Sequence, residues 1–105
     1  MKTKIVFIAL AILFLFSCKK DNPGPNEVFM DGTKFNPSSL TISSGTTITW
    51  TNKESSTHTV TSDKGTFESG DMMKSKTFSF TFTTAGTFAY HCKHHSGMTG
   101  SVTVQ

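Results

Sequence analysis

The chain has 105 residues, with ten Lys, no Arg and seven acidic residues, and 35% of it is hydrophobic. This length suits one small domain, and the hydrophobic content together with only 16% charged residues excludes a disordered chain and a coiled coil. Two of the Lys precede a predicted cleavage site. The remaining eight nearly balance the acidic residues, which argues against a nucleic-acid-binding protein.

Residues 1–17 have the order of a secretory signal peptide, with two Lys before a twelve-residue apolar run, Ile5–Phe16. A transmembrane helix needs about twenty apolar residues, so a membrane span is the weaker interpretation. The sequence Leu15-Phe16-Ser17-Cys18 resembles the lipobox of bacterial lipoproteins. We therefore expect 18–25 to be a lipidated Cys18 with a flexible tether. The alternative is a plain cleaved signal peptide with an incidental Cys18. Either way the protein is exported, to the periplasm or the cell surface.

Residues 26–105 form the predicted folded domain, in which apolar residues alternate with Thr, Ser, Ala or His from Leu40 onward. The alternating runs are Leu40–Ile42, Ile48–Trp50, His58–Thr61, Phe78–Phe82, Phe88–Cys92 and Val102–Val104. A period of two indicates half-buried strands of an antiparallel sheet, and no stretch shows a helical stripe. We predict an all-β Greek-key β-sandwich of seven to eight strands. Its core would draw on Trp50, the aliphatic residues and seven Phe: Phe29, Phe35, Phe67, Phe78, Phe80, Phe82 and Phe88.

If Cys18 carries lipid, Cys92 is the lone cysteine of the domain and has no disulfide partner. A free thiol in an oxidising compartment needs burial or a ligand to protect it. Cys92 shares the strand face of Phe88 and Tyr90, so its sulfur is expected to point inward and His91 outward. The simplest alternative is a buried thiol that acts as a small apolar side chain.

The loop after this strand brings further donors close to Cys92. His95 follows Cys92 by three residues and Met98 follows His95 by three. Gly97 and Gly100 permit a tight loop here rather than a continued strand. Such a loop can direct a thiolate, an imidazole and a thioether toward one point.

A fourth donor comes from His58, which has the parity of Val60 and is therefore expected to face the core. Taken alone, an inward His or a Met is more often structural than a ligand. Together, however, two imidazoles, one thiolate and one thioether are typical of blue copper sites with a weak axial Met. Zinc is the competitor, because Cys-x₂-His spacing also suits it, but zinc prefers a different fourth ligand to a thioether.

On these residues the domain resembles the cupredoxins, and its Cys-x₂-His-x₂-Met loop looks most like that of the amicyanin group. The matching motifs are Phe35-Asn36-Pro37, Leu40-Thr41-Ile42, Gly45–Trp50, His58-Thr59-Val60, Ala85–Phe88 and the loop His91–Met98. The resemblance implies an eight-stranded sandwich and one-electron transfer, with one copper ion held by His58, Cys92, His95 and Met98. The chain departs from the family pattern at His94, where Pro is usual before the ligand His, and at Thr59, where Asn often ties the two ligand loops.

We therefore expect an exported copper protein that alternates between Cu(II) and Cu(I) and carries single electrons between redox partner proteins. It would be a monomer and no enzyme, and it would meet the membrane only through its lipid anchor. One alternative is a copper carrier or storage protein that delivers copper to an exported oxidase, and another is a metal-free adhesion or binding sandwich. The expected surroundings of the site are a solvent-facing His91 and His94, one buried residue of the pair Met72 and Met73, and a solvated face with Lys74, Lys76 and Lys93.

Overall fold

The computed structural model describes residues 21–105. The predicted signal peptide, 1–17, and the predicted lipid attachment site, Cys18, lie outside the described residues. Within the described part, no helix is long and apolar enough to cross a membrane.

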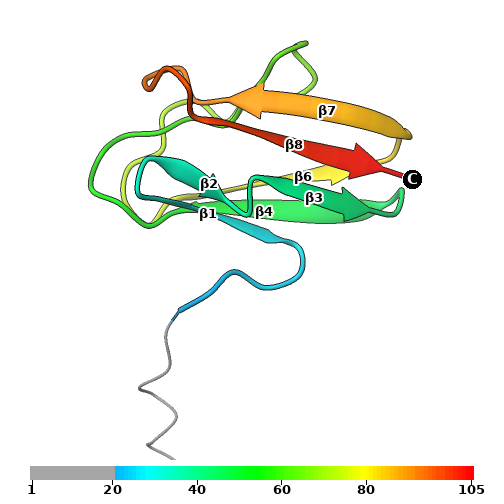
Figure 1. Ribbon diagram of the computed structural model, residues 1–105, viewed down its shortest axis with the longest axis horizontal. Helices are drawn as coiled ribbons and strands as arrows, with labels where there is room; N and C mark the ends of the chain where they lie inside the picture. Colours follow the sequence, from blue (N-terminus) through cyan, green and yellow to red (C-terminus); the bar gives the residue numbers. More distant parts are fainter. Residues whose placement is uncertain (1–20) are drawn as a thin grey trace, which may run out of the picture.

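The described chain folds into two four-stranded sheets packed as layers (Figure 1). The first sheet has the order β2-β1-β4-β6, with β1 Glu27–Asp31, β2 Lys34–Asn36, β4 Thr46–Asn52 and β6 Thr77–Phe82. The second has the order β3-β8-β7-β5, with β3 Ser39–Ile42, β8 Thr99–Val104, β7 Gly86–His91 and β5 Thr61–Ser62. The all-β sandwich is thus confirmed, with eight strands.

Both sheets are mixed, so the expectation of antiparallel sheets is wrong for two of the strand pairs. Strands β1 and β4 run parallel, with Val28 opposite Trp50, and β3 and β8 run parallel, with Leu40 opposite Val102. The other pairs are antiparallel. An alternating pattern tells which face a side chain occupies, but it carries no information on the direction of the neighbouring strand.

The core lies between the sheets and centres on Trp50. Ile48, Trp50 and Asn52 point inward from β4 and have no exposed surface. The Trp50 ring meets that of Tyr90 edge-on, with their centroids 5.5 Å apart. Of the seven Phe expected in the core, three are only partly buried: Phe78, Phe80 and Phe88.

Strand ends gather at the end of the sandwich opposite the C-terminus (Figure 1). Strand β7 stops just before Cys92, and β8 begins just after Met98, so the loop that joins them lies at this end. The β1–β2 turn, formed by Gly32 and Thr33, lies at the same end. This end therefore collects the residues that the sequence singles out as metal ligands.

Candidate metal centre

Three predicted ligands come together where the segment before β5 meets the β7–β8 loop. The ligand atoms of His58, Cys92 and His95 all lie within 4.8 Å of one another. The Sγ atom of Cys92 is 3.8 Å from Nδ1 of His58 and 3.5 Å from Nδ1 of His95. His58 is fully buried and Cys92 is 4% exposed, whereas His95 is partly exposed. A buried thiol therefore stands between two imidazoles that both present the same ring nitrogen to it.

His58 is held by backbone pairing rather than by a long strand. The expected run from His58 to Thr61 is strand only from Thr61 onward, because β5 covers two residues. Before it, His58 forms an isolated bridge with Met72: the His58 N–H donates to the Met72 carbonyl at 3.2 Å, and the His58 carbonyl accepts the Met72 N–H at 2.8 Å. This bridge directs the imidazole inward, as its parity predicts. Met72 is buried and Met73 is 56% exposed, which confirms that one member of the pair is in the core.

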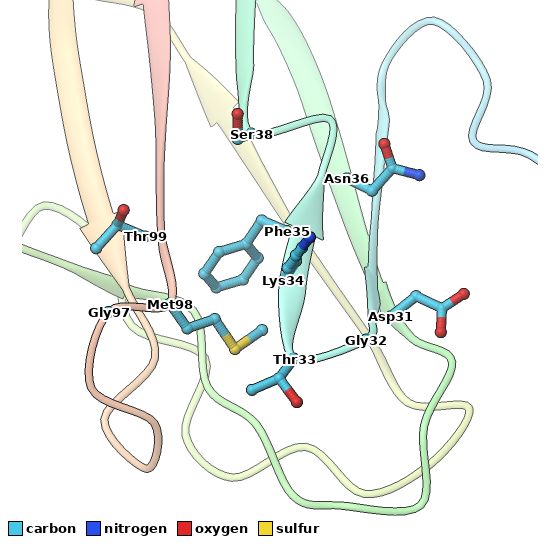
Figure 2. A pocket seen from close by; sticks show the side chains of 10 residues that line it. All are labelled: Asp31, Gly32, Thr33, Lys34, Phe35, Asn36, Ser38, Gly97, Met98 and Thr99. Atoms are coloured by element: carbon cyan, nitrogen blue, oxygen red, sulfur yellow. The ribbon is translucent and has the colours of Figure 1, made fainter.

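The loop from Cys92 to Met98 closes on itself. The Met98 N–H donates to the His95 carbonyl at 3.1 Å, and the Cys92 N–H donates to the Met98 carbonyl at 3.0 Å. Gly97 has a φ of 85°, a left-handed conformation that favours glycine, so the predicted tight turn forms there. Met98 is buried, and its side chain lies near the Phe35 ring on the wall of a surface cavity of about 600 Å³ (Figure 2).

Gly100 has a different role from the one expected of it. It lies within β8, directly opposite Tyr90 on β7, and not in the loop. A Cβ at Gly100 would stand 2.5 Å from the Tyr90 hydroxyl oxygen, so the aromatic ring requires a residue without a side chain here. Burial raises the pKa of Tyr90 to about 12, and the neighbouring Trp50 opposes this only in part. The Tyr90 hydroxyl is therefore protonated throughout the ordinary pH range.

Thr59 ties the two ligand segments together, although its side chain is shorter than the Asn often found there. Its backbone N–H donates to Sγ of Cys92 at 3.4 Å, and its hydroxyl accepts the Lys93 N–H at 2.9 Å. Thr59 itself is 1% exposed. The segment after β4 and the β7–β8 loop are thus joined next to the thiol by a buried side chain.

His94 and His91 face outward, as the sequence predicts, and each contacts an acidic residue. His94 Nε2 is 2.7 Å from Oδ1 of Asp71, and His91 Nδ1 is 2.6 Å from Oδ1 of Asp63. The structure brings His95, and not His94, to the cluster. The contact with Asp71 holds the loop at the position where the family usually has Pro.

Two residues around the site are not among those the sequence singles out. Asn52 accepts the Glu54 N–H at 2.8 Å and donates to the carbonyls of Ser56 and Met72, at 2.8 and 2.9 Å. The parity of Asn52 with the inward residues of β4 is a signal that could have identified it. Glu54 lies in the following loop, where no such pattern exists.

The Glu54 carboxylate contacts His58 on the ring nitrogen that faces away from Cys92. Its Oε1 atom is 2.6 Å from Nε2 of His58, and its oxygens accept the Thr33 N–H at 3.1 and 3.2 Å. Partial burial raises the pKa of Glu54, but the hydrogen bonds from His58, Thr33 and Gly32 outweigh it and hold the pKa below its ordinary value. Glu54 is therefore ionised at neutral pH.

The chemistry of these donors fits copper better than zinc. Within residues 21–105 the cluster includes no fourth imidazole, thiolate or carboxylate beside His58, Cys92 and His95. The remaining soft donor in the same loop is the Met98 thioether. A set of imidazole, thiolate and thioether suits copper, whereas zinc sites are completed by a fourth Cys, His, carboxylate or water. The three residues can thus form a copper site.

Comparison with known proteins agrees with the fold and the cluster. A profile of the cupredoxin-like domain matches residues 4–104. Plastocyanin of Scenedesmus fuscus is 37% identical over 84 residues, which cover 68% of this chain and 86% of that protein. Amicyanin of Paracoccus denitrificans is 39% identical over 77 residues, which cover 69% of this chain but only 59% of that protein. The structure of a Cu(I) form of an amicyanin mutant matches with a TM-score of 0.72 at 32% identity, over 85% of this chain and 88% of the other. A sandwich of eight strands with this sequence likeness shows that the chain belongs to the cupredoxin-like family.

Proposed function

We propose that this protein is a type 1 copper electron carrier that holds one copper ion through His58, Cys92, His95 and Met98. The observation that carries the proposal is a buried thiol flanked by Nδ1 of two imidazoles, at 3.8 and 3.5 Å. A buried thiol ionises readily only when a cation compensates its charge, and a bound metal ion supplies that charge. Copper in this position would supply a one-electron change between Cu(II) and Cu(I).

The backbone around the donors supports a site that keeps its shape. His58 is fixed by two hydrogen bonds with Met72, and Cys92 is fixed by the Met98 carbonyl and the Thr59 N–H. Hydrogen bonds of this kind orient ligands and tune the metal that they hold. We infer that they keep the donor atoms in one arrangement in both oxidation states, which favours rapid electron transfer.

Exposure suggests where electrons enter and leave. His58 is fully buried and Cys92 nearly so, whereas His95 is partly exposed at the end of the sandwich. We propose His95 as the contact point for redox partner proteins, with the protein acting as a monomer and not as an enzyme. The sequence of 1–25 further supports an exported protein that is tethered to a membrane through lipidated Cys18.

The visible absorption spectrum of the purified protein loaded with Cu(II) tests this proposal. We expect an intense blue thiolate-to-copper band that disappears in Cys92→Ser and is lost or strongly changed in His95→Ala. The matched control is His94→Ala, which removes the adjacent imidazole outside the cluster and should keep the band. A wild-type protein with only faint absorption would refute the thiolate site. Rapid loss of Cu(I) to a mild chelator would instead favour copper carriage.

A further inference from the structure

We infer that Glu54 is a positioning residue for the metal centre, whose carboxylate orients the His58 ring so that the Nδ1 lone pair faces Cys92. The inference rests on the proposed function, which supplies the metal ion. The contact between Glu54 and His58 itself is present in the structure. The carboxylate oxygen and Nε2 of His58 are 2.6 Å apart, and the side chain of His58 has no exposed surface.

The chemistry of the two groups determines which ring nitrogen carries the proton. An ionised carboxylate can only accept hydrogen bonds, so Nε2 of His58 must be the donor. In a neutral imidazole the other nitrogen, Nδ1, then has a free lone pair. That nitrogen lies 3.8 Å from Sγ of Cys92, on the side of the ring where a metal would bind.

Glu54 can position the ring because it is itself held in place by two other segments. The Thr33 N–H of the β1–β2 turn donates to both of its carboxylate oxygens, and its own N–H donates to Oδ1 of Asn52 at the end of β4. Its side chain is only 19% exposed. A single carboxylate thus links the turn, the end of β4 and the buried imidazole.

Within residues 21–105, the other hydrogen-bonding group recorded next to Nε2 of His58 is the hydroxyl of Ser56. The hydroxyl of Ser56 is 3.4 Å from Nε2 of His58, a longer distance than that to Glu54. A hydroxyl both donates and accepts, so it stabilises either tautomer of the ring. Without Glu54, we therefore expect His58 to populate both tautomers.

The first test uses the metal-free protein and reads the tautomer from the ¹⁵N chemical shifts of the His58 ring, at a pH about 1.5 units above the ordinary histidine pKa of about 6.5. The wild type should show the Nε2–H tautomer, and Glu54→Gln should keep it because the amide oxygen still accepts. Glu54→Ala should give a mixture. Asp31→Asn removes an exposed carboxylate at the end of β1, next to the turn that contacts Glu54, and is the matched control, with no expected change. If Glu54→Ala does not fold, the Glu54→Asp variant is used in its place. The Asp side chain is one methylene shorter, so its carboxylate should not reach Nε2 of His58.

The second test measures Cu(II) affinity by competition with a chelator. Loss of a partner that orients a metal-binding His typically weakens affinity about 10- to 100-fold, and we expect that loss in Glu54→Ala but not in Glu54→Gln. A wild-type tautomer in Glu54→Ala, or a Glu54→Gln protein that behaves like Glu54→Ala, would overturn the inference. If the wild type binds no copper, the proposed function fails, while the tautomer measurement still decides the role of Glu54.

Discussion

Replacement of Gly100 by Ala provides a quantitative test of the core packing around Tyr90, two residues before Cys92 of the candidate metal centre. The added Cβ would lie 2.5 Å from both Cζ and Oη of Tyr90 and 2.8 Å from its Cε1 atom. Ordinary van der Waals contact begins at 3.4 Å, so the ring or β8 must shift by about 0.9 Å.

The surroundings of Tyr90 leave little room for such a shift. Its ring is 1% exposed and meets Phe35 edge-on at 4.8 Å and Trp50 edge-on at 5.5 Å. Excess volume in a well-packed core typically costs about 1–3 kcal/mol, and each kcal/mol lowers the Tm of a domain of this size by about 4–8 °C. We expect Gly100→Ala to lower the free energy of unfolding by about 1–3 kcal/mol.

Chemical and thermal unfolding of the metal-free protein measure the cost directly. Gly24→Ala is the matched control, since its added Cβ would meet Glu27 at an ordinary 3.4 Å. A second comparison uses the double variant Gly100→Ala with Tyr90→Leu. The free energy of unfolding that Gly100→Ala costs relative to Tyr90→Leu alone should be smaller than the cost of Gly100→Ala in the wild type. A free energy of unfolding for Gly100→Ala within about 0.5 kcal/mol of wild type would refute the reasoning, because surface substitutions stay within that limit.

Two further predictions concern the segments that surround the site. Thr59→Ala should destabilise the metal-free protein by about 1–3 kcal/mol in urea unfolding, because the Lys93 N–H loses its 2.9 Å acceptor. Thr59→Ser keeps the hydroxyl and should lose much less of the free energy of unfolding. Equal losses in both variants would contradict the role of the hydroxyl as acceptor for the Lys93 N–H. Partial burial raises the pKa of Glu68, but the hydrogen bonds that it accepts outweigh this effect and hold the pKa below its ordinary value. The largest lowering effect comes from the Gly70 N–H. The contribution of Glu68 to stability is therefore present above the ordinary carboxyl pKa and is lost as pH falls through the lowered one. It is at most about 1 kcal/mol, because the Glu68 side chain is 41% exposed and its ion pair with Lys93 lies at the surface. The difference in unfolding free energy between wild type and Glu68→Gln should shrink between neutral and acidic pH, and a constant difference would contradict the prediction.

Local patterns in the sequence predict much of this molecule. Alternation along the chain places Ile48 and Trp50 in the core, and the eight strands form the predicted sandwich. The parity of His58 and Cys92 predicts their inward direction, which the structure confirms. Such inferences succeed because a strand's two faces follow from its own side chains, without reference to other strands.

The direction of neighbouring strands and the contacts across the site depend on the tertiary structure alone. Parallel pairing of β1 with β4, the contact of Tyr90 with Gly100 and the contact of Glu54 with Thr33 leave no local pattern. Thr33 and Glu54 are 21 residues apart, and Thr59 and Cys92 are 33 apart. Residues so distant in sequence meet only after their strands have paired, β1 with β4 in the first case and β5 with β7 in the second. The sequence by itself thus determined the fold class and the inward direction of His58 and Cys92, whereas the tertiary structure decided how these side chains are oriented and held.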